Sequence, residues 1–348
     1  MSGDAPAPLS RRRRALYLVA ALTITAMVAA LVLEATIRYV APQPGPMRWL
    51  QPDPRYGHVM RPNANERYSF EGTDFVMEVN TNSLGLRDTE LRAARDNEQT
   101  VLFLGDSVTF GHALNVDQRF DTLLDIQLAE AGRSYRLINA GVNAWGTLQA
   151  TRYAADHFDT FDPDVIVLTF TGNDPSDDAY FLEKGQSFDV VRFPGKRFLR
   201  DHSHLYRLAT HYAFVIYHSL TTKRQSRAEA DTPIDKQSGH VISEEQWTAT
   251  HTILRNFRDA FLAHSPEGAI LLQPSAPKEE HIRAHLQTIC NELGFVFIDM
   301  SAHVRDIPAA DLRLPYDGHW SPLMHKISAE KLFGALSERD ATEIQQPL

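Results

Sequence analysis

The sequence predicts an α/β protein with a mostly parallel central sheet, preceded by an N-terminal transmembrane helix. Short, continuous apolar runs alternate along the chain with segments of helical apolar spacing, and polar turns follow several of these runs. Strands that are apolar on both faces are typical of parallel sheets covered by helices on both sides. A long uncharged stretch that follows four arginines near the N-terminus predicts the membrane segment.

Composition and charge narrow the class of protein. The 348 residues are 43% apolar and 23% charged, which fits a folded α/β domain with additions rather than a disordered chain. The net charge is −9, and residues 1–14 carry +3, so the remainder carries −12. The negative net charge of residues 15–348 argues against a function in nucleic-acid binding. The single cysteine, Cys290, excludes an internal disulfide and a cysteine-based zinc site.

We interpret residues 1–14 as a cytoplasmic basic tail and residues 15–40 as a transmembrane anchor. The uncharged stretch Ala15 to Leu33 would span about 28 Å as a helix, close to a hydrocarbon core of about 30 Å. Arginines precede it, and no basic residue follows until Arg38. We therefore expect a single-pass protein of a bacterial inner membrane, with its body in the periplasm and the lipid bilayer as a partner of residues 15–40.

Two other interpretations of this segment stay open. A signal peptide cleaved near Val28-Ala29-Ala30 has the small residues that cleavage needs, but it would leave an apolar new N-terminus. A buried core helix would place Arg11–Arg14 beside a dry core.

Residues 41–98 are predicted to form a proline-rich tether and a small β preamble. Proline fixes φ and removes a hydrogen-bond donor, so the proline-rich stretch predicts extended chain. Alternating residues over Arg67–Asn80 predict two short strands around Gly72, and residues 82–87 form a turn-rich loop. The prolines are Pro42, Pro44, Pro46, Pro52, Pro54 and Pro62.

The body, residues 99–340, carries the alternating pattern. Residues 175–242 interrupt it with a polar loop, a predicted helix from His204 to Leu220 and a charged run from Lys223 to Lys236. This insertion is a candidate lid or substrate wall, or a solvated surface excursion. Strands are predicted at Thr100–Leu104, Tyr135–Ile138, Val165–Phe170, Ala269–Leu272 and Phe295–Ile298, and helices at Phe120–Ala131, Leu148–Phe158, Lys278–Leu293 and from Pro322.

Ser107 is a candidate nucleophile. It follows the predicted strand through Gly105 and Asp106, and reactive groups in parallel sheets lie at the carboxyl ends of strands. A serine hydroxyl needs an adjacent base, and a helix cap is the alternative role for such a serine. The segment differs from the elbow of α/β-hydrolases, because position 109 is Thr.

His319, before the last helix, can accept the serine proton, and Asp317 can orient its imidazole. Two loops at strand ends offer donors for an oxyanion: Asn139 to Ala144 and Thr171 to Asp174. Asn173 supplies an amide, and the other loop supplies backbone N–H groups. Preorganised donors of this kind are worth roughly 3 to 4 kcal/mol each.

With these motifs, residues 100–335 resemble the SGNH (GDSL-like) hydrolase family, and Asn82–Asp88 resembles a loop of its membrane-anchored bacterial members. The resemblance implies a flavodoxin-like three-layer α/β/α fold. It also implies a Ser-His-Asp mechanism in an esterase or acyltransferase. No cofactor is expected.

Several positions depart from the family pattern. Val108 replaces the usual leucine, and Thr171 replaces a glycine. The oxyanion glycine of the second block falls on Ala144, with Gly141 nearby as a turn glycine. The Ala144 N–H could still donate to an oxyanion if φ there is negative. The last block is Asp317-x-His319, one residue shorter than the usual Asp-x-x-His.

The resemblance implies that Ser107 attacks an ester, that His319 moves the proton, and that Ser107, Ala144 and Asn173 form the oxyanion hole. The expected function is an extracytoplasmic serine esterase acting on a small acyl ester, acetyl on a glycan. An O-acetyltransferase for a cell-envelope polysaccharide and a non-catalytic glycan-binding scaffold are the alternatives.

We expect no metal site, because His281 and His285, spaced for zinc on a helix, lack a carboxylate partner.

Overall fold

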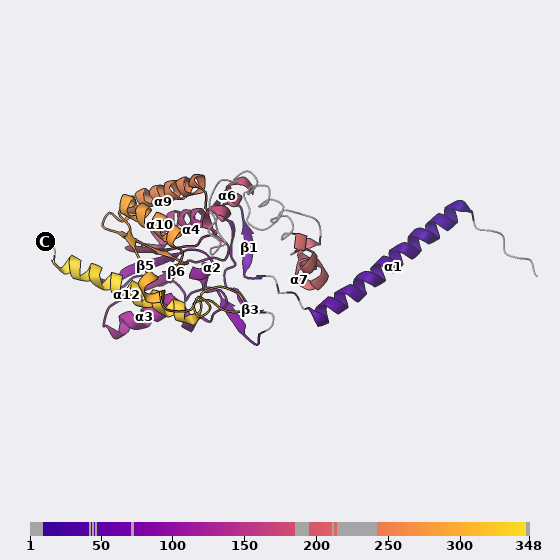
Figure 1. Cartoon of the computed structure of the whole chain (residues 1–348), viewed down its shortest axis with the longest axis horizontal. Coiled ribbons are helices and arrows are strands. Elements are labelled where there is room, and N and C mark those ends of the chain that lie inside the picture. The colour runs from indigo at the N-terminus through magenta and orange to yellow at the C-terminus, as the bar shows by residue number, and fades with distance from the viewer. Residues whose placement is uncertain are drawn as a thin grey trace, which may run out of the picture. The chain divides into compact units, whose positions relative to one another are not determined.

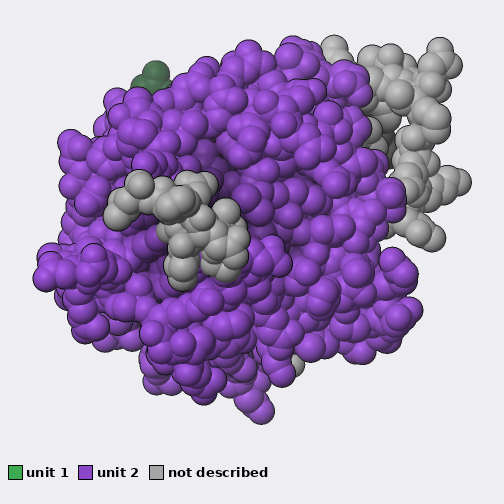
Figure 2. Space-filling view, turned by 90° about the vertical axis from the view of Figure 1, so that its left-hand side faces the viewer, with its two compact units in different colours: residues 1–46, 191–232 green, residues 47–190, 233–348 purple. Residues whose placement is uncertain are grey.

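The chain divides into two compact units, drawn in separate colours in Figure 2: Met1–Pro46 with Val191–Thr232, and Met47–Val190 with Pro233–Leu348. The charged run from Lys223 to Lys236 lies outside the described residues, as does Gly72. The computed structural model describes residues 10–41, 43, 45, 47–70, 73–184, 195–210, 212, 213 and 242–345.

The first unit is built on α1 (Arg11–Val40), a 30-residue helix whose side chains are mostly exposed. Its mean hydropathy of 2.5 over an 18-residue window makes it long and apolar enough to cross a membrane, a property that a signal sequence shares. Near its C-terminal end, the Glu34 carboxylate accepts hydrogen bonds from the N–H groups of His204 and Leu205. The unit also contains α7 (Lys196–His202).

The second unit contains the predicted parallel sheet. Its five strands run in the order β6-β5-β7-β8-β9, and every neighbouring pair is parallel. This is the strand order of flavodoxin-like folds. The strands are β5 (Gln99–Leu104), β6 (Tyr135–Asn139), β7 (Val165–Phe170), β8 (Ala269–Pro274) and β9 (Val296–Phe297).

Helices cover both faces of the sheet, which confirms the three-layer α/β/α architecture (Figure 1). In β5, Leu102 and Leu104 pack into one core and Val101 and Phe103 into the other, because successive side chains point to opposite faces. One face carries α3 (Phe120–Glu130) and α12 (Pro322–Gln345), and the other carries α4 (Thr147–Asp156), α9 (Glu244–His264) and α10 (Glu280–Leu293).

Two long helices were not predicted from the sequence. Ser243 begins α9 with a capping box in which its side chain accepts from the Gln246 N–H, and Trp247 follows as a buried residue. Within the predicted insertion, residues expected as a polar loop form α6 (Asp174–Lys184). Shorter helices are α2 (Ser107–Phe110), α5 (Phe158–Phe161), α11 (Ser301–Val304) and a 3₁₀ turn, η1 (Val116–Gln118).

The prediction of an extended tether is wrong from Met47 onward. Trp49 is 1% exposed and stacks on Phe110, with ring centroids 5.9 Å apart. Burial of such aromatic surface holds the proline-rich chain against the body. The chain here forms two antiparallel hairpins, β1 (Leu50–Asp53) with β2 (Gly57–Met60) and β3 (Asn65–Ser69) with β4 (Val76–Asn80), the second of which was predicted.

The loop after β4 anchors the segment that follows Ser107. The guanidinium of Arg87 is buried and donates to four backbone carbonyls. Two of these, at Phe110 and Gly111, end the helix α2 that Ser107 begins. Hydrogen bonds to a buried guanidinium offset its desolvation, so this loop stabilises the position of α2.

Candidate active site

Ser107 lies at the carboxyl end of β5, where it begins α2. The Asp106 side chain accepts from the Val108 N–H and thereby caps this short helix. Gly105 has φ +148°, and a Cβ there would lie 2.4 Å from Oγ1 of Thr109. A glycine is therefore required for the chain to turn from the strand into the helix.

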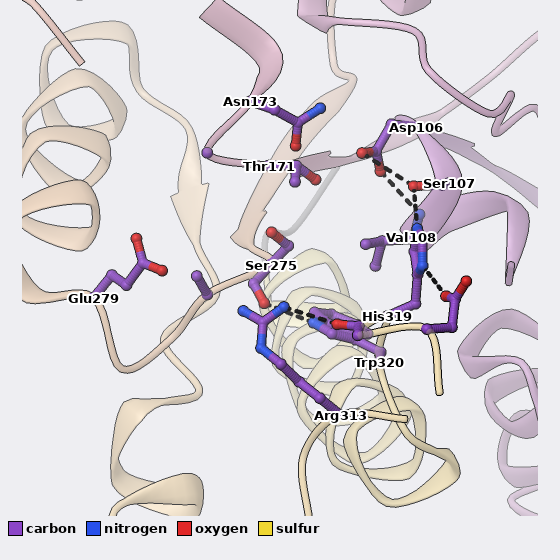
Figure 3. A pocket seen from close by; sticks show the side chains of 14 residues that line it. Asp106, Ser107, Val108, Thr171, Asn173, Ser275, Glu279, Arg313, His319 and Trp320 are labelled. Carbon is purple, nitrogen blue, oxygen red and sulfur yellow. Dashed lines mark hydrogen bonds and ion pairs between the residues drawn. The ribbon is translucent and has the colours of Figure 1, made fainter. Parts of the chain in front are cut away.

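The structure brings Ser107, His319 and Asp317 into one hydrogen-bonded chain (Figure 3). Nε2 of His319 lies 2.8 Å from Oγ of Ser107, and Nδ1 of the same ring bonds a carboxylate oxygen of Asp317. This is the geometry in which an imidazole can accept a serine proton while a carboxylate orients the ring.

Although Asp317 and His319 are only two residues apart, their side chains meet because Gly318 forms a tight turn between them. Gly318 has φ +83°, and its N–H and the Leu314 N–H both bond backbone carbonyls in a tight turn. This turn places the carboxylate of Asp317 beside the imidazole two residues later. Burial alone would raise the pKa of Asp317, but hydrogen bonding and the charge of His319 bring that pKa below its ordinary value.

These side chains line a pocket of about 220 Å³. Figure 3 shows Ser107 and His319 on one side of it and Glu279 on the other. Asn173 lines the pocket as predicted, and its amide also donates to Asp177 at 2.6 Å. Neither Ala144 nor Gly141 is among the lining residues.

Ala144 adopts φ +59°, so the condition of a negative φ at this position is not met. A glycine at this position, as in the family pattern, would adopt this left-handed conformation without cost, whereas a Cβ is strained there. Among the described residues no hydrogen-bond acceptor pairs with the Ala144 N–H.

Buried carboxylates surround the base of α6 close to the site. Burial raises the pKa of Asp106 and Asp174, and it raises the pKa of Asp178 to about 7. One oxygen of Asp178 accepts from the Leu148 N–H, and the other has no partner among the described residues. These groups hold the loops in place at a cost in stability.

Sequence reasoning missed several residues that the fold brings to the site. Arg313 and Glu279 line the pocket, and His112 lies with His319 and Asp317 in a cluster of possible ligand atoms within 4.8 Å of one another. No motif marks any of them. The expectation that His281 and His285 have no carboxylate near them is wrong for His285, whose Nε2 lies 3.9 Å from Oε1 of Glu244.

Residues 103–327 match the model of the GDSL-like Lipase/Acylhydrolase family. Since the match covers more than half of the chain, the protein belongs to this family of hydrolases.

Solved structures that resemble the chain have low sequence identity to it. TesA is 13% identical over 68% of this chain and 98% of its own, with a TM-score of 0.42. A family 3 carbohydrate esterase of Clostridium thermocellum is 16% identical over 69% and 99%, with a TM-score of 0.40. The esterase EstA from a Pseudoalteromonas species is 11% identical over 69% and 98%, with a TM-score of 0.42. The comparison with curated proteins found no match.

Ala144→Gly should stabilise the protein by about 1 kcal/mol, because a glycine relieves the strain of a positive φ. Thermal unfolding of the full-length chain in detergent measures this as a rise in Tm of a few degrees. Ala140→Gly is the matched control, since φ of Ala140 is not positive, and it should lower Tm. An equal fall in Tm in Ala144→Gly and Ala140→Gly would contradict the strain at Ala144.

Asp178→Asn should change how stability depends on pH. Folding raises the pKa of Asp178 from 3.8 to about 7. The neutral Asp178 carboxyl therefore contributes to folding stability fully below about pH 4, and this contribution is lost as the pH rises to about 7. The asparagine stays neutral and can still accept from Leu148. The Tm of Asp178→Asn relative to wild type should therefore be higher at pH 8 than at pH 5.

Asp306→Asn makes the same chemical change at an exposed position and is the matched control. A Tm difference between Asp178→Asn and wild type that is the same at pH 5 and pH 8 would contradict the raised pKa.

Proposed function

We propose that this hydrolase is a serine esterase that uses Ser107, His319 and Asp317 as a catalytic triad. The observation that carries the proposal is the 2.8 Å contact between Nε2 of His319 and Oγ of Ser107, continued to the carboxylate of Asp317. A serine in hydrogen-bond contact with an oriented imidazole is an activated nucleophile. The family supports ester cleavage as the reaction class.

In the proposed reaction, Oγ of Ser107 attacks the ester carbonyl carbon as its proton passes to Nε2 of His319. The Ser107 N–H and the Asn173 amide, both at the pocket, donate to the oxyanion. The carbon–oxygen bond then breaks, and the leaving alkoxide takes the proton from His319. Water repeats the sequence on the acyl-enzyme and releases the acid.

We propose a small acyl group, acetyl on a glycan, as the substrate. A pocket of about 220 Å³ is small for a long acyl chain. Arg313 and Glu279 in the lining can hydrogen-bond sugar hydroxyls, which supports a polar leaving group.

We propose further that α1 anchors the protein in the bacterial inner membrane, with the body in the periplasm. The length and apolar character of α1 support an anchor. The arginines at its start support a cytoplasmic N-terminus.

The chemistry is tested on the full-length chain in detergent with p-nitrophenyl acetate. Ser107→Ala should abolish turnover and labelling by a fluorophosphonate, and Asp317→Asn should lower kcat by up to about 10⁴-fold. Ser83→Ala, at an exposed serine outside the pocket, should leave ester turnover and fluorophosphonate labelling unchanged.

Wild-type protein that neither turns over esters nor reacts with the probe would overturn the esterase and favour a glycan-binding scaffold. With an acetyl donor and an oligosaccharide present, acetylated product formed in preference to free acetate would assign acyl transfer instead of hydrolysis.

The membrane orientation predicts that protease digests the body in spheroplasts but leaves it intact in whole cells. Immunoblotting against the body measures this. Protection of the body in spheroplasts would place it on the cytoplasmic side.

A further inference from the structure

A second histidine, His112, faces the carboxylate of Asp317. It is 4% exposed and lies five residues after Ser107, just beyond the end of α2. Its Nε2 is 3.7 Å from Oδ2 of Asp317, while the other carboxylate oxygen, Oδ1, bonds His319. The rings of His112 and His319 are 4.8 Å apart between centroids. Two imidazoles therefore share one carboxylate.

The hydrogen bonds behind His112 determine which of its nitrogens carries the proton. Nε1 of Trp49 can only donate, and it lies 3.1 Å from Oδ1 of Asn143. This contact orients the Asn143 amide, so that its Nδ2 donates to Nδ1 of His112 at 3.0 Å. Since Nδ1 accepts, the proton of the neutral ring is on Nε2. That proton is directed at Asp317.

The surroundings of His112 favour the neutral ring. Aromatic rings of Tyr68, Phe70 and Phe110 lie around it. Burial lowers the pKa of His112 to about 3, with further contributions from His319 and Arg87 that outweigh the opposite effect of Asp317. The lowered pKa and the contact with Asn143 both favour a neutral His112 ring that donates through Nε2.

We propose that His112 is a positioning residue for Asp317, held in its donor form by Trp49 and Asn143. The inference rests on the proposed triad, in which Asp317 must keep one oxygen aimed at His319. Asp317 and His319 lie on a turn at the pocket edge, with side chains 16% and 27% exposed. A donor on the second oxygen limits rotation of the carboxylate. The 3.7 Å separation needs to shorten by under about 1 Å to become a hydrogen bond.

Two substitutions of His112 separate this donor from simple packing. In His112→Gln the side-chain amide can place its nitrogen near the former Nε2 and still donate to Asp317. In His112→Asn the shorter side chain can accept from Asn143 but cannot reach Asp317. Asn143→Asp removes the amide donor, and therefore the orientation of the His112 proton, while keeping an acceptor for Trp49.

We expect kcat for p-nitrophenyl acetate, measured on the full-length chain in detergent, to fall about 10- to 100-fold in His112→Asn and Asn143→Asp. KM should change little, and His112→Gln should keep most of the activity. In His112→Asn the acid limb of the kcat profile should move to higher pH, because Asp317 without its donor stabilises the His319 cation more strongly.

His325→Asn is the matched control, because His325 is also fully buried and its Nδ1 accepts from the Phe120 N–H, a bond that asparagine can keep. It should leave kcat and the acid limb unchanged. Wild-type kcat in His112→Asn would overturn the proposal. Equal losses in His112→Asn and His112→Gln that follow a fall in Tm would assign His112 to packing alone.

A measurement independent of turnover completes the test. Side-chain ¹⁵N chemical shifts of histidine-labelled protein, assigned with His112→Gln, should show His112 as the Nε2–H form from pH 5 to 9. A proton on Nδ1, or titration of His112 in this range, would overturn the proposal. If wild type cleaves no ester and resists the fluorophosphonate, the proposed function fails, and these shifts still decide the state of His112.

Discussion

Ser107 and His319 are separated by 212 residues, yet their side chains meet at 2.8 Å. The contact depends on the parallel sheet, because parallel strands end at the same edge and bring their following loops together. Ser107 follows the strand β5 directly, and His319 precedes the helix α12, which packs on α3 across one face of the sheet. A change that shifts β5 against α12 would separate the Ser107 hydroxyl from the His319 imidazole.

The segment before the sheet takes part in this arrangement. Arg87 holds the end of α2 through backbone carbonyls, and the Asp88 carboxylate accepts from the Asn139 N–H at the end of β6. Trp49 packs on Phe110 and orients Asn143. Residues 47–98 are thus a structural part of the hydrolase unit, and Trp49, Arg87 and Asp88 contact residues at the carboxyl edge of the sheet.

The same edge carries groups that cost stability. Asp106, Asp174 and Asp178 are buried carboxylates with raised pKa values, and Ala144 has a strained φ. Strained backbone and perturbed carboxylates are common where loops are held for chemistry rather than for stability. Burial of apolar side chains in the cores on both faces of the sheet offsets the cost of these carboxylates and of the strained backbone.

The sequence by itself determined the parallel sheet, because continuous apolar strands such as Val165–Phe170 need no distant information to be found. It also marked Ser107, Asn173, Asp317 and His319 as candidates through short local motifs. It did not mark the helix α9, although a capping box begins it at Ser243, nor the buried position of Trp49 among prolines.

Only the tertiary structure decided how these parts meet. The left-handed φ of Ala144 and the approach of His112 to Asp317 depend on packing between segments far apart in the chain. Local patterns report the preference of a segment for strand or helix, whereas hydrogen-bond partners are set by the packing of the whole core.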